Sequence, residues 1–317
     1  MSNEGKTESK KAKVISFINM KGGVGKTTLC REIGYTLNKE FKKSILFIDI
    51  DPQANLTQSL FEKYNLLPQD LFNDLKSDEQ KEIKICNQSI NVLLSGGQVT
   101  PEKDDLIAHL EENNPKLDLI PGDLKTVFLE RNNTGSIAEN SLDKFIAKKR
   151  VAEDYDFIFI DCPPTYSFYT TAAFNASDYY IVPVGIDPYS VLGIDLLEQV
   201  VFSIKDNNWR AFETKHLENM GIIFNPLGYT SNATISRQFS NQKDSIISSE
   251  KLKKYQFYYF RNIFTYNSKY KEELGYFNID SNDNKHNNNI NSIVLEFLDR
   301  LSFLNSQLED TNDSKDR

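Results

Sequence analysis

The sequence predicts a doubly wound α/β domain in which a mostly parallel sheet is flanked by helices. Short apolar runs of strand length occur at residues 14–18, 44–49, 157–161, 179–184 and 220–224. Segments of helical length separate several of these runs, and strands that alternate with helices form parallel β-α-β units. A glycine-rich stretch follows the first run and acids end two others. We therefore expect a ligand site at the carboxyl ends of the strands.

The length of the chain suits one large α/β domain or two small ones. The 317 residues are 39% hydrophobic and 12% aromatic, with a formal charge of −8. That charge argues against a surface covered by nucleic-acid contacts, but it permits a local basic patch. Cys30, Cys86 and Cys162 form no C-x-x-C pair, so we expect neither a disulfide framework nor a zinc site, and we expect a reducing cytosol. No signal peptide is recognised, and no apolar run approaches the roughly 20 residues of a membrane span.

The domain organisation follows from where these patterns begin and end. We expect a single domain at residues 14–308, preceded by a polar, disordered arm at 1–13. A charged, disordered tail is expected at 309–317. Residues 62–150 carry no recognisable motif and are expected to form a variable, helical region. The asparagine-rich stretch 280–291 has low complexity and is expected to be a loop.

The elements of the first half can be assigned in order. Residues 14–18 are apolar throughout and indicate a buried strand. The stretch from Lys26 to about Glu40 has a helical pattern, and a second strand ends at Asp49. Residues 56–80 are expected to be helical and exposed. Two further short strands are expected at 90–94 and 117–120.

The second half repeats this alternation. Strands are expected at 157–161, 179–184 and 220–224, and an amphipathic helix at 190–205. A last strand is expected within 257–264. The apolar spacing at the end of the chain predicts a final helix over residues 292–308.

The strongest motif is Lys21-Gly22-Gly23-Val24-Gly25-Lys26-Thr27-Thr28. It follows a predicted strand and opens a predicted helix, as a phosphate-binding loop does. Glycines allow the backbone N–H groups to converge on phosphate oxygens, and the helix N-terminus adds its positive end. In such a loop Lys26 reaches the β- and γ-phosphates, and the Thr27 hydroxyl binds Mg²⁺.

The loop departs from the usual G-x-x-x-x-G-K-[ST] pattern, because Met20 replaces the first glycine and Lys21 follows it. A second lysine beside two glycines resembles the deviant Walker A box of the ParA/MinD family. That resemblance implies a P-loop ATPase that uses ATP and Mg²⁺. It also implies a homodimer with ATP, in which Lys21 reaches the phosphates of the partner subunit, as an arginine finger does in trans.

Two acidic segments complete the resemblance. Asp49-Ile50-Asp51-Pro52-Gln53-Ala54-Asn55 is similar to the D-x-D-P-Q-x-N segment of ParA proteins. By that resemblance Asp51 positions the hydrolytic water and Asp49 supports the metal shell. Phe157 to Asp161, followed by Cys162 and two prolines, resembles a Walker B strand. Asp161 would then bind a magnesium-coordinated water, and Cys162 would be a packed small side chain.

The segment after the fifth apolar run leaves two interpretations open. Asn225-Pro226 stands where the family often contacts the adenine, and an amide offers a base edge both a donor and an acceptor. The same dipeptide is also a common turn.

A basic region lies between Lys205 and Lys271, with eleven Lys and Arg against five Asp and Glu. In ParA proteins this part of the chain binds nonspecific DNA, and phosphate contacts need only positive charge. A solvated basic face would give the same pattern. The candidate contacts are Arg237, Lys243, Lys253, Lys254, Arg261, Lys269 and Lys271.

The resemblance is to Soj-like partition ATPases without an N-terminal helix-turn-helix domain. It implies a cytoplasmic, nucleoid-associated protein that segregates a plasmid or chromosome with a ParB-type centromere-binding protein. A MinD-like membrane ATPase is the alternative, but the acids Glu296 and Asp299 on the last predicted helix argue against anionic lipid. A reductase like the nitrogenase iron protein would need cluster-bridging cysteines, and the surroundings of Cys86 and Cys162 do not fit.

Overall fold

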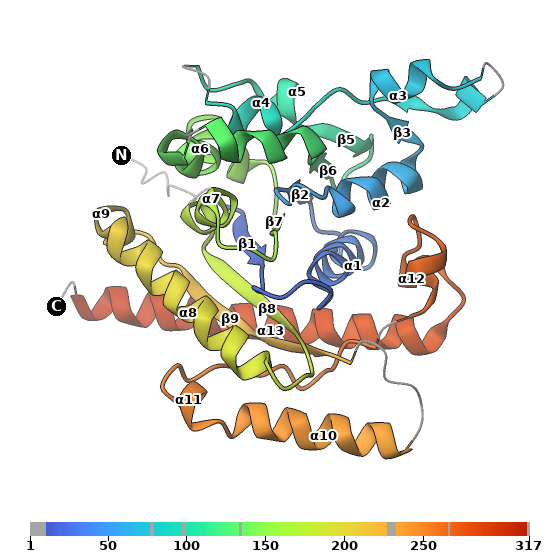
Figure 1. Ribbon diagram of the computed structural model, residues 1–317. Coiled ribbons are helices and arrows are strands. Elements are labelled where there is room, and N and C mark those ends of the chain that lie inside the picture. Colours follow the sequence, from blue (N-terminus) through green and yellow to red (C-terminus); the bar gives the residue numbers. More distant parts are fainter. Residues whose placement is uncertain are drawn as a thin grey trace, which may run out of the picture.

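The computed structural model describes residues 11–76, 79–96, 99–132, 135–226, 233–265 and 267–315. Within them the chain forms a seven-stranded sheet of order β5-β6-β2-β7-β1-β8-β9. Neighbouring strands are parallel except β5 and β6. The mostly parallel, doubly wound sheet is confirmed (Figure 1). The strands are β1 (Lys13–Phe17), β2 (Ile45–Asp49), β5 (Ala108–Glu111), β6 (Leu117–Ile120), β7 (Phe157–Asp161), β8 (Tyr179–Gly185) and β9 (Glu218–Asn225).

Helices cover both faces of the sheet. The buried side chains of α1 (Lys26–Lys39), α2 (Asn55–Tyr64) and α13 (Asn284–Lys315) belong to the core on one face. Those of several other helices belong to the core on the other face. Among them are α4 (Asn91–Leu94), α6 (Gly135–Lys148), α7 (Phe168–Ala176) and α8 (Ser190–Asn207).

Strand β7 shows why the strands appear in the sequence as unbroken apolar runs. Phe157 and Phe159 belong to the core beneath α1 and α13, whereas Ile158 and Ile160 belong to the opposite core. The rings of Phe159 and Phe297 of α13 lie 5.9 Å apart in an edge-to-face arrangement. Successive side chains of a strand point to opposite faces. A sheet that is covered on both sides therefore needs apolar residues at every position.

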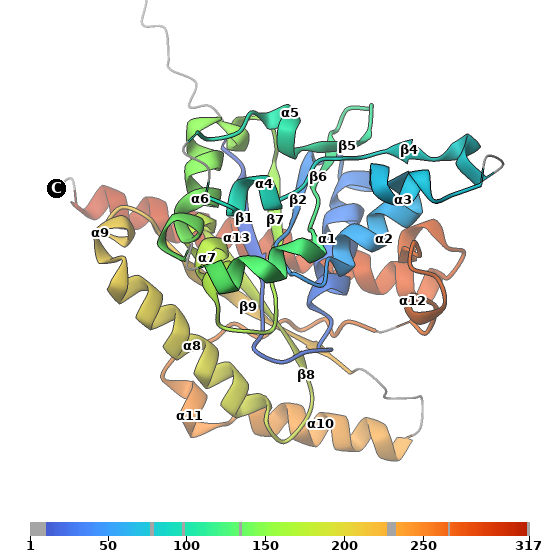
Figure 2. The same cartoon turned by 45° about the horizontal axis from the view of Figure 1, so that its top comes forward.

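Shorter elements occupy the connections and the edges. A two-stranded parallel pair, β3 (Leu66–Leu67) and β4 (Lys84–Ile85), stands apart from the main sheet. Helices α10 (Ala233–Ile247) and α11 (Glu250–Lys253) lie below the sheet in both orientations (Figure 1, Figure 2). The remaining helices are α3 (Gln69–Asn73), α5 (Lys103–Leu106), α9 (Trp209–Phe212), α12 (Lys269–Glu272) and the 3₁₀ turns Glu79–Glu82, Leu124–Asn132, Val151–Glu153 and Asn278–Asp280.

Residues 62–150 differ from the expected helical region. The helix predicted over 56–80 ends at Tyr64, because Asn65 takes a left-handed conformation with φ of 53°. The strand predicted at 90–94 is wrong, since these residues form α4. A short apolar run does not distinguish a buried strand from a buried helical turn. The region also supplies β5 and β6, which complete one side of the main sheet.

The end of the chain is more helical than expected. Helix α13 begins at Asn284, within the stretch predicted to be a loop, and continues to Lys315, past the expected end at residue 308. Ile290, Ile293, Val294 and Phe297 are fully buried along it. This helically spaced apolar stripe outweighs the modest helix propensity of asparagine.

Two other expectations are met only in part. Tyr259, within the strand expected at 257–264, makes an isolated bridge to Ile222 of β9 rather than part of a regular strand. The expected N-terminal arm lies outside the described residues up to residue 10, but Ala12 is buried and Lys13 begins β1. In the described part of the chain, no helix combines the length and apolarity needed to cross a bilayer.

A buried ionic cluster fixes α1 against the segment before α13. Arg31 donates to the carbonyls of Leu274 and Tyr276 at 2.9 and 3.2 Å. Glu32 is fully buried and accepts the backbone N–H of Asn278 at 3.2 Å. Burial raises the pKa of Glu32 from 4.5 to about 7, although Arg31 and the Asn278 N–H oppose the rise. A group whose folded pKa is raised stabilises the fold below its unfolded pKa and loses that contribution as pH rises.

As the pH rises from about 4.5 to 7, we expect the free energy of unfolding of the wild type to decrease by more than that of Glu32→Gln. A pKa that moves from 4.5 to about 7 corresponds to roughly 3 kcal/mol. Urea denaturation of both proteins at several pH values measures the difference. Glu40→Gln, at the exposed end of α1, is the control and should follow the wild type. Parallel profiles for Glu32→Gln and wild type would contradict the assignment.

Candidate functional site

The glycine-rich loop joins β1 to α1 at the carboxyl edge of the sheet. Gly23 and Gly25 have φ of +71° and +89°, a left-handed conformation that side chains disfavour. A Cβ at Gly22 or Gly23 would meet no atom within 4 Å, so this part of the loop faces open space. Helix α1 begins at Lys26, which brings its first N–H groups to the same place. The loop has the form of an anion cradle.

Lys26 lies inside this cradle. Its side chain is buried, and its ammonium donates to the Lys21 carbonyl at 3.2 Å. Burial lowers the pKa of Lys26, while the carboxylates of Asp161 and Asp51 oppose the fall. A phosphate at the loop would compensate this buried cation and accept its remaining donors.

Two acids end adjacent strands beside the loop. Asp49 of β2 and Asp161 of β7 are paired in register, and both are fully buried. The Thr27 hydroxyl donates to Asp161 Oδ2 at 2.6 Å. Asp161 Oδ1 is buried with no hydrogen-bond partner among the described residues. Burial, and then the nearby Asp49, raise the pKa of Asp161.

The donor set at Thr27 and Asp161 fits Mg²⁺, which prefers oxygen ligands and usually keeps several waters and substrate phosphates in its shell. The unpartnered Oδ1 of Asp161 is an acceptor that such a shell would satisfy. Among the residues described, no group of three or more His, Cys, Asp or Glu could hold a metal ion by itself.

Asp49 has a different environment from Asp161. Its Oδ2 accepts the backbone N–H and the hydroxyl of Thr57, both at 2.8 Å, and its Oδ1 accepts the Asp51 N–H at 3.3 Å. Asp51 is also buried and accepts the Gln53 N–H at 2.9 Å. Both oxygens of Asp49 thus hold the turn that carries Asp51.

Asn225 comes from the other side of the loop, at the end of β9. Its Nδ2 donates to the Val24 carbonyl at 3.1 Å, and a Cβ on Gly25 would lie only 2.1 Å from that Nδ2. The Asn225 Oδ1 is buried and unpartnered in the described part of the chain. The Asn225 side chain therefore contacts the loop through its Nδ2 and leaves its Oδ1 available as an acceptor. Pro226 follows it, and Thr28 lies in the first turn of α1.

Several residues that sequence reasoning missed hold the site together. Asn19 donates to the Pro183 carbonyl at 2.7 Å and accepts the Lys21 N–H at 3.0 Å. Thr57 links Asp49 to Gly122, whose N–H donates to the Thr57 hydroxyl at 2.7 Å. Asp187 pairs with Lys21. Pro183, Gly122 and Asp187 come from segments far along the chain, so no local motif marks these contacts.

Two cavities flank the acids and the loop. One of about 330 Å³ is lined by Lys21, Met20 and the start of α8. A larger cavity of about 650 Å³ lies between α2, β3 and α3. Thr57 and Gly122 line the larger cavity, but Lys21, Lys26 and Asp161 do not.

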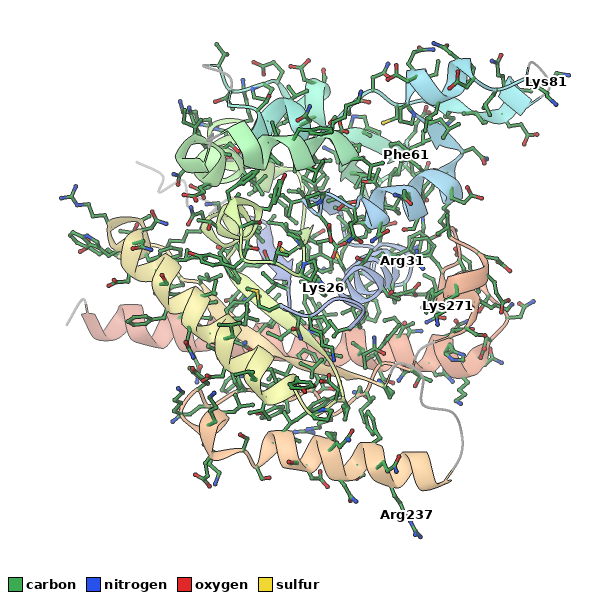
Figure 3. The ribbon with its side chains drawn as sticks, in the orientation of Figure 1. Lys26, Arg31, Phe61, Lys81, Arg237 and Lys271 are labelled. Atoms are coloured by element: carbon green, nitrogen blue, oxygen red, sulfur yellow. The ribbon has the colours of Figure 1, made fainter. Side chains whose placement is uncertain are left out.

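The candidate DNA-binding residues are divided between two regions. Arg237 and Lys243 are on α10, and Lys253 and Lys254 lie in or beside α11. Lys269 and Lys271 lie on α12, on a different side of the molecule from Arg237 (Figure 3). Arg261 is exposed in the segment before α12.

Two of the basic residues already have acidic partners. Lys254 lies 3.2 Å from Asp195 of α8, which also holds Lys251 at 3.1 Å. Lys253 pairs with Glu250. The pairing with Asp195 attaches α11 to α8.

Comparison with known proteins identifies relatives of this chain. The family described as an AAA domain matches residues 12–214. An uncharacterised protein of Methanocaldococcus jannaschii is 32% identical over 212 residues, 67% of this chain and 72% of that protein. The virulence plasmid ParA family protein pGP5-D of Chlamydia psittaci is 30% identical over 213 residues, 67% of this chain and 68% of that protein.

Solved structures share the fold at lower identity. A putative plasmid partition protein from Borrelia burgdorferi, bound to AMPPNP, has a TM-score of 0.59 at 22% identity, covering 90% of this chain and 99% of that one. Cobyrinic acid a,c-diamide synthase from Mycobacterium smegmatis, with an ATP analogue and magnesium, has a TM-score of 0.57 at 22% identity, covering 83% and 89%. Because these two proteins have different names and activities, function has to be argued from the site.

We expect Thr57→Val to destabilise the protein by about 1–3 kcal/mol, because it leaves the partly buried Gly122 N–H without its acceptor and removes a donor from the buried Asp49. Urea denaturation at pH 7 measures the loss. Thr57→Ser keeps the hydroxyl and should lose less than Thr57→Val. Equal stability of the valine variant and the wild type would show that these hydrogen bonds do not hold the Asp51 turn.

Proposed function

Because the chain belongs to the AAA-domain family and to its ParA/MinD-type P-loop ATPases, we propose that it binds ATP with Mg²⁺ and hydrolyses it to drive DNA partition. The observation that carries the proposal is the loop itself. The carbonyl of Lys21 accepts from the buried ammonium of Lys26, next to the Thr27–Asp161 pair. The Lys26 ammonium, the Thr27 hydroxyl and the Asp161 carboxylate thus lie together at the glycine-rich loop.

The residues of the loop would divide the binding of ATP among them. Lys26 compensates the charge of the β- and γ-phosphates, and backbone N–H groups from Gly22, Gly23, Val24 and Gly25 contact their oxygens. Thr27 would hold Mg²⁺ and Asp161 would hold a water bound to it; when bound, the ion would supply positive charge for phosphoryl transfer. Thr28 lies in the turn that follows, and Asn225 with Pro226 would contact the adenine.

Asp51 would orient the attacking water. It lies in a turn fixed by Asp49 and Thr57, so its carboxylate is held before substrate arrives. We propose that Asp49 acts on the metal shell through this turn, because both of its oxygens already accept hydrogen bonds. Lys21 would act in trans across an ATP-bound homodimer and stabilise charge at the partner's phosphates, as an arginine finger does.

The proposed biological partners are nonspecific DNA and a ParB-type centromere-binding protein, at the nucleoid in the cytoplasm. The relative from Chlamydia psittaci is named as a ParA family protein, and the exposed Arg237 and half-buried Lys243 of α10 supply positive charge for phosphate binding. A MinD-like membrane role is the alternative. It has less support, because the carboxylate of Glu296 on α13 accepts the backbone N–H groups of Arg261 and Asn262. These hydrogen bonds hold the helix against the rest of the domain.

We expect Asp51→Ala to bind ATP normally but to hydrolyse it at least about 100-fold more slowly, the usual loss when a positioned base or water-orienting group is removed. Because binding survives, the variant should accumulate as an ATP-bound dimer in light scattering with ATP and Mg²⁺. Lys26→Ala should lose ATP binding itself, since it removes the charge at the phosphates. Unchanged turnover in Lys26→Ala, or an Asp51→Ala protein that stays monomeric where wild type dimerises, would contradict these roles.

We expect DNA binding to require ATP and to weaken steeply with salt, without sequence preference. Only a dimer joins two basic faces, and linkage raises the effective concentration of the second contact. At least two charge reversals among the seven candidate residues should weaken gel-shift binding without lowering basal ATPase activity. Arg237→Glu and Lys243→Glu on α10 are the strongest choices, and each should lower the slope of log K against log [salt] by about 2 per dimer.

The control for these reversals is Lys81→Glu. Lys81 is exposed at the opposite end of the molecule from Arg237 (Figure 3), so the same change of charge should leave DNA binding intact. Equal DNA binding with ADP and ATP, or stronger binding to anionic vesicles than to DNA, would favour the membrane role instead.

A further inference from the structure

Lys21 is engaged within its own subunit. Its ammonium lies 2.5 Å from Asp187 Oδ2, in an ion pair whose side chains are 48% and 21% exposed. The Lys21 backbone is fixed separately, because its N–H donates to Asn19 and its carbonyl accepts from Lys26. The side chain is thus the mobile part of this residue, and Asp187 determines where its charge lies.

Asp187 is itself held firmly at the start of α8. Its Oδ1 accepts the Tyr189 N–H at 2.9 Å, and the Ser190 hydroxyl lies 2.9 Å from its Oδ2. That hydroxyl also lies 2.7 Å from the Gly185 carbonyl, which anchors the turn to the end of β8. A carboxylate at the N-terminus of a helix is favoured by the helix dipole. Lys21 is therefore the partner that moves when the ion pair opens.

We propose that Asp187 is a positioning residue that holds Lys21 in cis and restrains ATP-driven dimerisation. The proposal rests on the trans role of Lys21 given above. An ammonium held 2.5 Å from one carboxylate does not reach the phosphates of another subunit, so the pair must open before the dimer closes. We call the Lys21–Asp187 ion pair the latch. Each subunit contributes one latch, and both latches open in a symmetric dimer.

The strength of the latch sets the size of its effect. A partly exposed ion pair contributes modestly, so its removal should change the equilibrium by about 2- to 5-fold for each subunit. The dimerisation constant should change by roughly the square of that factor, because two latches open. Since the pair is half-exposed, added salt should weaken it.

The test is Asp187→Asn, which keeps the side-chain shape and the acceptor for the Tyr189 N–H but removes the charge. We expect the variant to dimerise with ATP and Mg²⁺ at a protein concentration about 4- to 25-fold lower than wild type, by light scattering. Added salt should reduce the difference between the concentrations at which the variant and the wild type dimerise. Asp206→Asn, an exposed carboxylate at the other end of α8, carries the same charge change and should behave like wild type.

A second measurement does not depend on dimerisation. In nucleotide-free protein, the rate at which an amine-reactive reagent labels Lys21, followed by mass spectrometry, should rise in Asp187→Asn and not in Asp206→Asn. Unchanged labelling, or dimerisation weaker than wild type, would overturn the latch. Failure of the wild type to dimerise with ATP, or normal dimerisation of Lys21→Ala, would instead overturn the trans role of Lys21.

Discussion

Two buried carboxylates on neighbouring strands are the constraint around which this site is built. Asp49 and Asp161 are register partners at the ends of β2 and β7, so the parallel sheet itself brings like charges together where water is excluded. Burial raises the pKa of both acids; the nearby Asp51 carboxylate adds to the rise for Asp49, and the nearby Asp49 carboxylate adds to the rise for Asp161. Each acid accepts a threonine hydroxyl: Asp49 from Thr57 of α2, the helix that follows its own strand, and Asp161 from Thr27 of α1, the helix that follows the neighbouring strand β1. Those two hydrogen bonds also fix the starts of α1 and α2.

The two acids differ in what remains available to a ligand. Asp49 uses both oxygens to hold the Asp51 turn, whereas Asp161 keeps a buried oxygen without a partner in the described chain. The positively charged side of the site comes from α1 and the glycine-rich loop. A nucleotide with Mg²⁺ would therefore balance charges of both signs that the fold has already buried, which is how a preorganised site stabilises transferred charge.

Helix α8 connects the nucleotide loop with the basic helices. Its first turn carries Ser190, next to the Lys21–Asp187 pair, and Asp195 one to two turns later holds Lys251 and Lys254 beside α11. The shared fold of a partition protein and a cobyrinic acid a,c-diamide synthase shows that the sheet alone does not choose an activity.

The sequence by itself determined the central strands, the phosphate loop and the acids, because each depends on a local pattern. Apolar runs become strands that are buried on both faces, glycines permit the left-handed loop, and an acid at a strand's end stays at the edge of the sheet. The resemblance carried by Lys21 and the Asp49–Asn55 segment identified the family, which the relatives confirm.

Tertiary structure decided the outcome where a weak local pattern competes with packing against distant segments. Residues 90–94 became a helix, and the asparagine-rich stretch from Asn284 joined α13 because Ile290 and Ile293 are buried on the sheet. It also decided that Lys21 meets Asp187 and that Lys254 meets Asp195. Such contacts join segments far apart in the chain, and only the packed sheet brings them together.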